Sequence, residues 1–446
     1  MLVRPAIIAL FYLLAQQCLH AQTAYRFDFG NGATAPGFTK ITSDCKFSYQ
    51  KGFGFDQQSV VQSVERKDKH PLTNDFITSA KPFFFSVKLP EGNYDVKLLL
   101  GDVAGTSATT VRAECRRLFF NDIKTKYGQV ISKTFTVHVK DSIIRDADGK
   151  AVSKVRLKPR EASYLHWDNL LTIEFNDSAA KVCALEIIPN KKATTIFLAG
   201  NSTVVDQDRE PWAAWGQMFP SFFKSGNVCV ANYAESGETL KAFKGERRLD
   251  KIWSMAKAGD YLFIEFAHND QKLGSSHLDP FTTYKQTLKE WIAEARKRNV
   301  IPVLVSSMNR RTFDSSGKIT NSLGDYPEAM RQIAKEEGVA LIDLNVMSKI
   351  LYESWGPLQS IKAFVHYPAN TFPHQPTELK DDTHFSTYGA FELARCVVQS
   401  IREQRLPLVK YIRKDVASFN PEHPDKYEQF YWPLSSFSSS TKPDGN

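Results

Sequence analysis

Cysteine is scarce in this sequence, and long apolar runs are nearly absent. Six cysteines are scattered through 446 residues, and their wide spacing matches neither a zinc knuckle nor a dense disulfide framework. At most one or two disulfides could form. The one conspicuous apolar run, AIIALFYLLA, lies within residues 1–22, and no later segment approaches the roughly 20 apolar residues that a membrane span needs. These scarcities exclude a disulfide-stapled miniprotein and a protein built from membrane-spanning helices.

Residues 1–22 differ from the rest of the chain. Arg4 is their only charged residue, and the apolar run is followed by LHAQ, which offers a small residue for cleavage near Ala21. This pattern is typical of a secretory signal peptide. We therefore expect an exported protein, periplasmic or extracellular. Cys18 is a weaker candidate for a lipid anchor, because the preceding AQQ lacks the small residue expected before a lipidated cysteine.

Charge of one sign is not concentrated anywhere. The formal net charge is +8, with 24% charged and 42% hydrophobic residues, which is normal for a globular protein. Because no basic stripe is present, we expect no nucleic-acid partner, whereas an acidic polysaccharide stays compatible with the charge. The chain is too long for one ordinary hydrophobic core, which predicts two domains.

The two halves of the chain have different periodicities. From about residue 25 to 190, apolar and polar residues alternate, as in YDVKLLL (94–100), and turn sequences such as LPEGN separate the runs. This pattern predicts an all-β antiparallel sandwich. After Pro189, unbroken apolar runs such as YLFIEFA alternate with helical stretches, which predicts a doubly wound α/β domain with a parallel sheet. Its expected strands are 195–199, 228–233, 260–266, 301–307 and 339–344, with a closing helix at 387–404.

Small and polar residues follow the expected strands of the second half. In an open parallel sheet, ligands bind at the carboxyl ends of the strands, so these positions are the candidate site. Asp381 and His384 stand just before the last helix. The residues after the first four strands are Gly200, Asn201 and Ser202, then Gly237, then Asn269, and then Arg310 and Arg311.

Three of these residues have the chemistry of a catalytic triad. A serine becomes nucleophilic when a base takes its proton, and a histidine oriented by a carboxylate is the usual base. We predict Ser202 as the nucleophile, His384 as the base and Asp381 as the orienting acid, joined to His384 by a loop or a single helical turn. Asp382 is the alternative acid, and the three-residue spacing favours Asp381. Taken alone, Ser202 would be a helix N-cap, and the GxSxG motif of α/β-hydrolases is absent around it.

The oxyanion formed by serine attack on a carbonyl needs hydrogen-bond donors. The predicted donors are the backbone N–H groups of Ser202 and Gly237 and the side-chain amide of Asn269. No segment has metal-ligand spacing, so we expect neither a metal nor a cofactor. His268 is predicted to be structural. Trp212, Trp215 and Phe219 follow helical spacing, so we expect them to be core residues.

The order of these blocks resembles the SGNH or GDSL-like hydrolase superfamily: GNS with Ser202, then Gly237, then HND with Asn269, then DDTH with His384. More narrowly, GNST, AHND and DDTHFSTYGA with the following LPLVKYI are similar to rhamnogalacturonan acetylesterases of carbohydrate esterase family 12, over about residues 193–411. The resemblance implies a three-layer, flavodoxin-like SGNH hydrolase domain that acts as a serine acetylesterase. It also implies an acetylated plant cell-wall substrate, pectic rhamnogalacturonan, whose carboxylates Arg310 and Arg311 could bind.

The opening YRFDFGNG is similar to galactose-binding-like jelly rolls. The expected organisation is a signal peptide (1–22), a galactose-binding-like β-sandwich (23–190), an SGNH hydrolase domain (191–411) and a C-terminal extension (412–446), whose polar end, SSFSSSTKPDGN, we expect to fray.

Two positions depart from the superfamily pattern. Asn201 and Ala267 stand where an aspartate and a glycine are usual. Because of Asn201, a non-catalytic carbohydrate-binding protein is the alternative function. Within the enzyme class, xylan or another polysaccharide is the alternative substrate.

Overall fold

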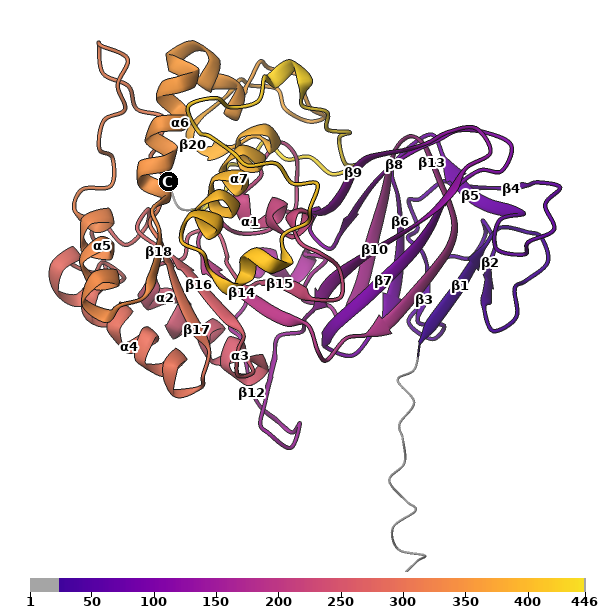
Figure 1. Ribbon diagram of the computed structural model, residues 1–446, viewed down its shortest axis with the longest axis horizontal. Coiled ribbons are helices and arrows are strands. Elements are labelled where there is room, and N and C mark those ends of the chain that lie inside the picture. The colour runs from indigo at the N-terminus through magenta and orange to yellow at the C-terminus, as the bar shows by residue number, and fades with distance from the viewer. Residues whose placement is uncertain (1–23, 445–446) are drawn as a thin grey trace, which may run out of the picture.

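The computed structural model describes residues 24–444, so the expected signal peptide lies outside the described range. The chain forms a β-rich N-terminal half and an α/β C-terminal half that lie beside each other (Figure 1). Between residues 24 and 444, no helix has the length and apolar character to cross a membrane.

The N-terminal half is a sandwich organised around one long strand, β13 (Leu170–Pro189). Its first part pairs with β6 and β8, and its second part pairs with β5, β7 and β1. The register breaks between Asn176 and Ala179, where the strand passes from one sheet to the other. The pairs are antiparallel except for β1 with β2. The other strands are β1 (Tyr25–Phe29), β2 (Thr39–Ile41), β3 (Phe53–Phe55), β4 (Gln62–Glu65), β5 (Asp75–Ser79), β6 (Phe83–Lys88), β7 (Gly92–Gly101), β8 (Ser107–Ala113), β9 (Arg117–Thr125), β10 (Val130–Val139), β11 (Ile143–Arg145) and β12 (Ala151–Lys154).

Alternation places the apolar side chains of this half inside the sandwich. In β7, Tyr94, Val96 and Leu98 are buried while Lys97 between them is exposed. Cys115, in a stretch that reads as strand, instead lies in the tight turn between β8 and β9, where its two neighbours have positive φ. All five cysteines within the described range are free thiols.

The C-terminal half contains a parallel sheet of five strands in the order β15-β14-β16-β17-β18, as predicted from the unbroken apolar runs. Its strands are β14 (Thr194–Gly200), β15 (Val228–Asn232), β16 (Tyr261–Glu265), β17 (Ile301–Val305) and β18 (Ala340–Ile342), and the separate pair β19 (Phe364–Tyr367) and β20 (Leu379–Phe385) follows. The helices are α1 (Trp215–Met218), α2 (Leu240–Gly245), α3 (Arg248–Met255), α4 (Lys285–Lys297), α5 (Tyr326–Glu337), α6 (Leu344–Gln359) and α7 (Thr387–Glu403). Single helical turns are η1 (Pro159–Ser163), η2 (Phe219–Phe222), η3 (Pro280–Tyr284), η4 (Ser360–Ala363), η5 (Pro407–Tyr411) and η6 (Tyr427–Gln429).

Helices cover both faces of this sheet, which makes three layers. In β14, Ile196 and Leu198 pack into a core shared with α1, α6 and α7. Phe197 and Ala199, on the opposite face, pack into a second core shared with α2, α3, α4 and α5. Burial on both faces is the reason why this strand reads as an unbroken apolar run. The predicted fold class is confirmed.

Buried ion pairs join the two halves close to the end of β14. Arg117 of β9 donates two hydrogen bonds, of 2.9 and 2.7 Å, to one carboxylate oxygen of Asp206. Arg116 pairs with Glu210 at 2.7 Å, and these four side chains are at most 2% exposed. Removing one partner would leave a buried charge uncompensated. The sandwich therefore fixes the segment that follows the first strand of the sheet.

The polar C-terminal end was expected to fray, but residues 435–444 are placed against both halves. Phe437 packs on Phe84 of the sandwich with ring centroids 5.4 Å apart. A backbone hydrogen bond of 2.9 Å connects Glu210 N–H to the Phe437 carbonyl. Apolar and backbone contacts thus hold a segment whose composition alone predicts none.

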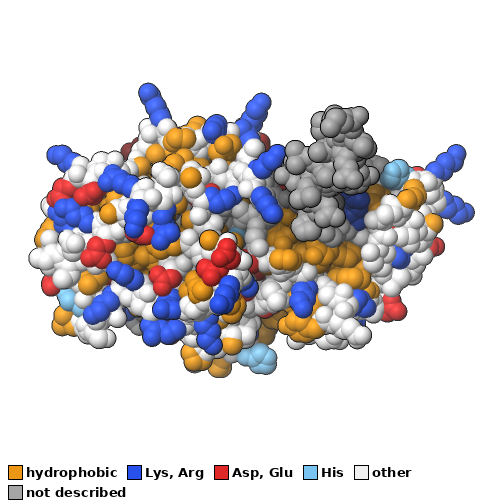
Figure 2. All heavy atoms as spheres, turned by 90° about the horizontal axis from the view of Figure 1, so that it is seen from below, with side chains coloured by type: hydrophobic (Ala, Val, Ile, Leu, Met, Phe, Trp, Pro, Cys, Tyr) orange, Lys and Arg blue, Asp and Glu red, His pale blue; other side chains and the backbone are white. Residues whose placement is uncertain are grey.

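On the face shown in Figure 2, basic and acidic side chains are intermixed.

Candidate active site

Ser202 stands two residues beyond the end of β14. Gly200 makes this tight exit possible, because a Cβ at that position would come within 2.5 Å of Val204 Cγ2. The chain turns at once, with the Val204 and Val205 N–H groups donating to the carbonyl of Asn201. Ser202 is only 2% exposed. A residue without a side chain is therefore required at the strand end for packing.

Ser202, His384 and Asp381 form a continuous chain of hydrogen bonds. His384 Nε2 lies 2.9 Å from Ser202 Oγ, and His384 Nδ1 lies 2.7 Å from Asp381 Oδ2. The other carboxylate oxygen of Asp381 accepts from the backbone N–H groups of Thr383 and His384 at 2.8 and 3.0 Å. The geometry is that of a nucleophile, a base and an orienting acid.

The expected loop or helical turn between Asp381 and His384 is instead part of β20. The register with β19 shifts there, so that Val365 opposes Asp381 and its neighbour Phe364 opposes Phe385. The bulge lets both side chains of the i, i+3 pair reach each other. Asp382, the alternative acid, contacts Arg311 and His366 at 2.8 and 2.9 Å.

The carboxyl group of Asp381 is held in its charged form. Burial is the largest single influence and raises its pKa, but hydrogen bonds from His384 and Thr383 together with the charge of His384 outweigh it, and the pKa falls to about 2. Asp381 therefore stays ionised over the pH range in which proteins are usually active.

Trp212 is a core residue, as its helical spacing predicted, because it is buried in a small cluster with Val365 and Leu379, and it also borders the site. Its ring meets the His384 ring edge-on, with centroids 5.8 Å apart and planes at 90°. It is 3% exposed. A tryptophan beside the imidazole excludes water and limits its movement. No sequence signal distinguishes this residue from Trp215, three positions later.

Asn201 accepts hydrogen bonds through its side-chain oxygen, as an aspartate at this position would. Its Oδ1 accepts from Thr203 N–H at 3.1 Å and from the Thr203 hydroxyl at 2.9 Å. The same hydroxyl lies 2.9 Å from Glu265 Oε1, and Trp215 Nε1 donates to Glu265 Oε2 at 2.6 Å. Burial raises the pKa of Glu265 to about 7. An amide at position 201 thus avoids a second carboxylate beside a buried glutamate.

Each of the three predicted oxyanion donors has an N–H without an acceptor among residues 24–444. Within residues 24–444, neither the Ser202 N–H nor the Gly237 N–H has a hydrogen-bond acceptor. Gly237 has φ +81, a conformation that favours glycine. The Asn269 amide donates one hydrogen bond, of 3.1 Å, to the Glu238 carbonyl. Its second N–H has no acceptor among residues 24–444.

The two arginines after β17 have different surroundings. Arg310 donates to the carbonyls of Ser322 and His268 at 2.9 and 3.3 Å, and its pKa is lowered by burial although Asp381 opposes this. Arg311 is engaged with Asp382, Ser360 and Pro357. The predicted structural residue His268 is buried, and burial holds its pKa well below the ordinary value.

The C-terminal residues 435–444 pass over the triad. Trp212 Nε1 donates to the Ser439 carbonyl at 3.1 Å. Lys442 Nζ lies 3.4 Å from Asp381 Oδ2, and its side chain is 46% exposed. This segment thus contributes a cation to the rim of the site, and no motif or spacing predicted that position for Lys442.

One group of described residues has the spacing of metal ligands. Atoms of Glu161, His166 and Glu235 lie within 4.8 Å of one another, and all three residues are buried. Both carboxylates are already paired, Glu161 with Arg248 at 2.5 Å and Glu235 with Arg160 at 2.7 Å. Since guanidinium groups already neutralise these carboxylates, we assign no metal to the cluster.

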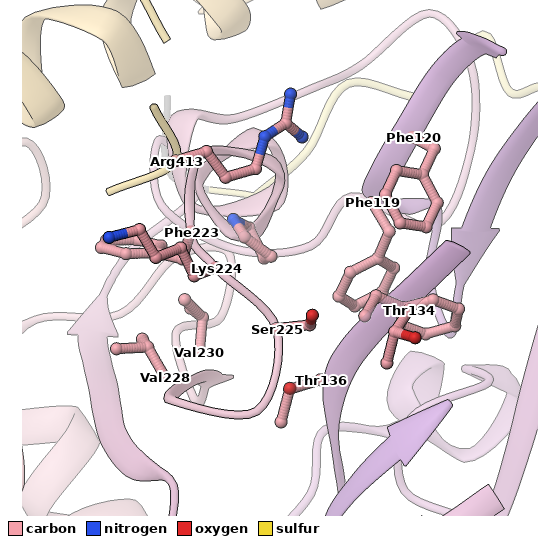
Figure 3. A pocket seen from close by; sticks show the side chains of 12 residues that line it. Phe119, Phe120, Thr134, Thr136, Phe223, Lys224, Ser225, Val228, Val230 and Arg413 are labelled. Atoms are coloured by element: carbon pink, nitrogen blue, oxygen red, sulfur yellow. The ribbon is translucent and has the colours of Figure 1, made fainter. Parts of the chain in front are cut away.

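A pocket of about 210 Å³ lies elsewhere, between the sandwich and the segment that precedes β15 (Figure 3). Phenylalanines from both halves line it, with Lys224 and Arg413 at its edge. It contains none of the predicted site residues. We therefore consider the triad, and not this pocket, to be the candidate site.

A serine hydrogen-bonded to a histidine–aspartate pair at the carboxyl end of a parallel sheet defines a class, the serine hydrolases. The chain belongs to the GDSL-like lipase/acylhydrolase family, whose model matches residues 198–390. Residues 25–145 match the galactose-binding domain-like part of the β-agarase/YXIM esterase-like proteins. The predicted superfamily and the galactose-binding-like type of the sandwich are confirmed.

Relatives narrow the class to acetylesterases. Rhamnogalacturonan acetylesterase RhgT of Bacillus subtilis (strain 168) is 42% identical over 224 residues, which are 50% of this chain and 95% of that protein. The probable rhamnogalacturonan acetylesterase YesY of the same organism is 34% identical over 226 residues, 50% of this chain and 99% of YesY. Its uncharacterized esterase YxiM is 26% identical over 390 residues, 85% of this chain and 91% of YxiM. The chain is an acetylesterase of this family.

Proposed function

We propose that this protein removes O-acetyl groups from pectic rhamnogalacturonan through a covalent acyl-enzyme. The observation that carries the mechanism is the hydrogen-bonded series Ser202–His384–Asp381, with distances of 2.9 and 2.7 Å. The proposed role is pectin degradation outside the cytoplasm, and the signal-peptide pattern of residues 1–22 supports export.

In the first half-reaction, Ser202 Oγ attacks the acetyl carbonyl while His384 Nε2 takes the hydroxyl proton. Asp381 stabilises the resulting imidazolium, and the N–H groups of Ser202, Gly237 and Asn269 receive the oxyanion. His384 then protonates the departing sugar oxygen, which leaves acetyl-Ser202. In the second half-reaction, His384 activates a water that releases acetate and restores the serine.

An acidic polymer fits the charges at the rim of the site. Lys442 lies 3.4 Å from Asp381 Oδ2, and the pKa of Lys272 is lowered by burial and by the charges of Arg310 and Lys442. Their mutual repulsion would be relieved by a carboxylate of galacturonic acid. The 42% identity to RhgT supports the same substrate class. We assign the carboxylate contact to Arg310, because Arg311 is already paired with the carboxylate of Asp382, whereas the Arg310 side chain donates to the neutral carbonyls of Ser322 and His268.

Two measurements test this function. Wild-type protein and Ser202→Ala are compared for release of p-nitrophenol from p-nitrophenyl acetate, where only the wild type should show turnover. Acetate release is then measured from acetylated rhamnogalacturonan, acetylated homogalacturonan and acetylated xylan. We expect the first polymer to react fastest. Equal rates on all three would refute the substrate assignment, and activity in Ser202→Ala would refute the mechanism.

A further inference from the structure

The proposed oxyanion donor Gly237 shares a peptide unit with the carbonyl of Ser236. A peptide unit is planar and its C=O and N–H point in opposite directions, so any group that fixes the carbonyl also fixes the direction of the N–H. The contacts of the Ser236 carbonyl therefore bear directly on the oxyanion hole.

Two cations of the N-terminal half donate to that carbonyl. Lys158 Nζ and Arg160 Nη2 each lie 2.7 Å from Ser236 O. They flank Pro159, the first residue of η1. A carbonyl oxygen has two lone pairs, and here both are used by ionised donors, which form shorter and stronger hydrogen bonds than neutral ones.

The same two cations hold the residues on either side of the peptide. Arg160 pairs with Glu235 at 2.7 Å, and Lys158 pairs with Glu238 at 2.5 Å. Both glutamates are at most 1% exposed, while the lysine and arginine side chains are 21% and 31% exposed. Lys158 and Arg160 thus hold the loop 235–238 through three of its groups: the carboxylate of Glu235, the carbonyl of Ser236 and the carboxylate of Glu238.

The segment 158–161, which carries both cations, is itself bound to the C-terminal half. Glu161 accepts a hydrogen bond of 2.7 Å from Lys158 N–H and is paired with fully buried Arg248 of α3 at 2.5 Å. On the outer side, Asp444 of the C-terminal segment contacts Arg160. Lys158 and Arg160 are therefore fixed in space, and they can fix what they bind.

We propose that Lys158 and Arg160 are positioning residues of the oxyanion hole: they aim the Gly237 N–H and make it a stronger donor. This inference rests on the proposed function. Hydrogen bonding to a carbonyl polarises the peptide and strengthens its N–H as a donor. The β-rich half is then part of the catalytic apparatus.

The test compares Lys158→Met, Arg160→Met and the double variant with Lys158→Arg and with Arg156→Met. Arg156 belongs to the same segment but donates to the Gly245 carbonyl, so its loss controls for disturbance of the segment. We expect each single Met variant to lower kcat for p-nitrophenyl acetate about tenfold, with KM changed less than about threefold. Lys158→Arg should recover most of the activity, and Arg156→Met should resemble the wild type.

A second readout reports on the oxyanion hole itself. Methylboronic acid forms a tetrahedral anionic adduct with a catalytic serine, so its inhibition constant should rise by the same factor as kcat falls. Lys158→Met leaves the Arg160–Glu235 pair in place and remains informative if Arg160→Met fails to fold. Wild-type kcat in Lys158→Met, or a lower kcat with unchanged boronate affinity, would overturn the inference. Absence of esterase activity in the unmodified protein would instead overturn the proposed function, and this inference with it.

Discussion

Replacing Asp381 by asparagine should reverse the tautomer of His384, the proposed catalytic base. One carboxylate oxygen accepts from two backbone N–H groups, those of Thr383 and His384. In the variant, the amide oxygen must take that position, because an NH₂ group there would face two donors. The NH₂ group then faces His384 Nδ1, which has to accept, and the imidazole proton moves to Nε2. A protonated Nε2 cannot take the proton of Ser202.

The expected loss is about ten thousandfold in kcat, or about 5 kcal/mol of transition-state stabilisation. The assay is p-nitrophenyl acetate hydrolysis near pH 7, with thermal denaturation to show that the variant is folded. Asp382→Asn is the matched control, since this neighbouring carboxylate is 48% exposed and pairs with Arg311. We expect the control to keep kcat within about threefold of the wild type, the effect of a surface ion pair. Equal losses in both variants, or a loss under about tenfold in Asp381→Asn, would refute the assignment of the acid.

Two further predictions concern neighbouring groups. Asn269→Ala should lower kcat for the same ester by about 10² to 10³, the effect of losing one oxyanion donor; an unchanged kcat would remove Asn269 from the proposed hole. Glu265→Gln should alter stability in a pH-dependent way, because burial raises the pKa of Glu265 to about 7, whereas the unfolded chain titrates near 4.3. For an acid with a raised pKa, stability falls as pH rises from about 4.3 to about 7, so the glutamine variant should gain about 2 to 3 kcal/mol relative to the wild type between pH 5 and pH 8. Chemical denaturation at both pH values measures this gain, and a difference that does not change with pH would contradict the buried-acid interpretation.

Periodicity predicted most of the architecture because it records which faces of an element are buried. Unbroken apolar runs predicted the parallel strands, and β14 (Thr194–Gly200) and β15 (Val228–Asn232) agree closely with the expected 195–199 and 228–233. The closing helix was expected at 387–404 and is α7 (Thr387–Glu403). Alternation likewise predicted the sandwich. It could not predict how β13 (Leu170–Pro189) changes sheets, since a bulge depends on strands distant in sequence.

Only some residues of the candidate site could be predicted from the sequence. Ser202, Asp381 and His384 could be named because a recognisable block surrounds each residue. Trp212 could not, because its spacing from Trp215 is that of a core residue and only the fold brings it to the histidine. Lys442 lies in a polar segment whose composition predicts disorder.

The sequence by itself determined the class of fold, the family and the residue types of the triad, since these depend on local pattern and on short motifs. Only the tertiary structure decided that Asp381 rather than Asp382 faces the histidine, and that Lys158 and Arg160 contact the peptide of Gly237. The physical reason differs between the two cases. The choice between Asp381 and Asp382 depends on the register of β20 with β19, and the contacts of Lys158 and Arg160 with Ser236 join residues more than 70 positions apart across the two halves. Hydrogen bonds act over about 3 Å in space, and no periodic pattern in the sequence indicates which residues will be partners.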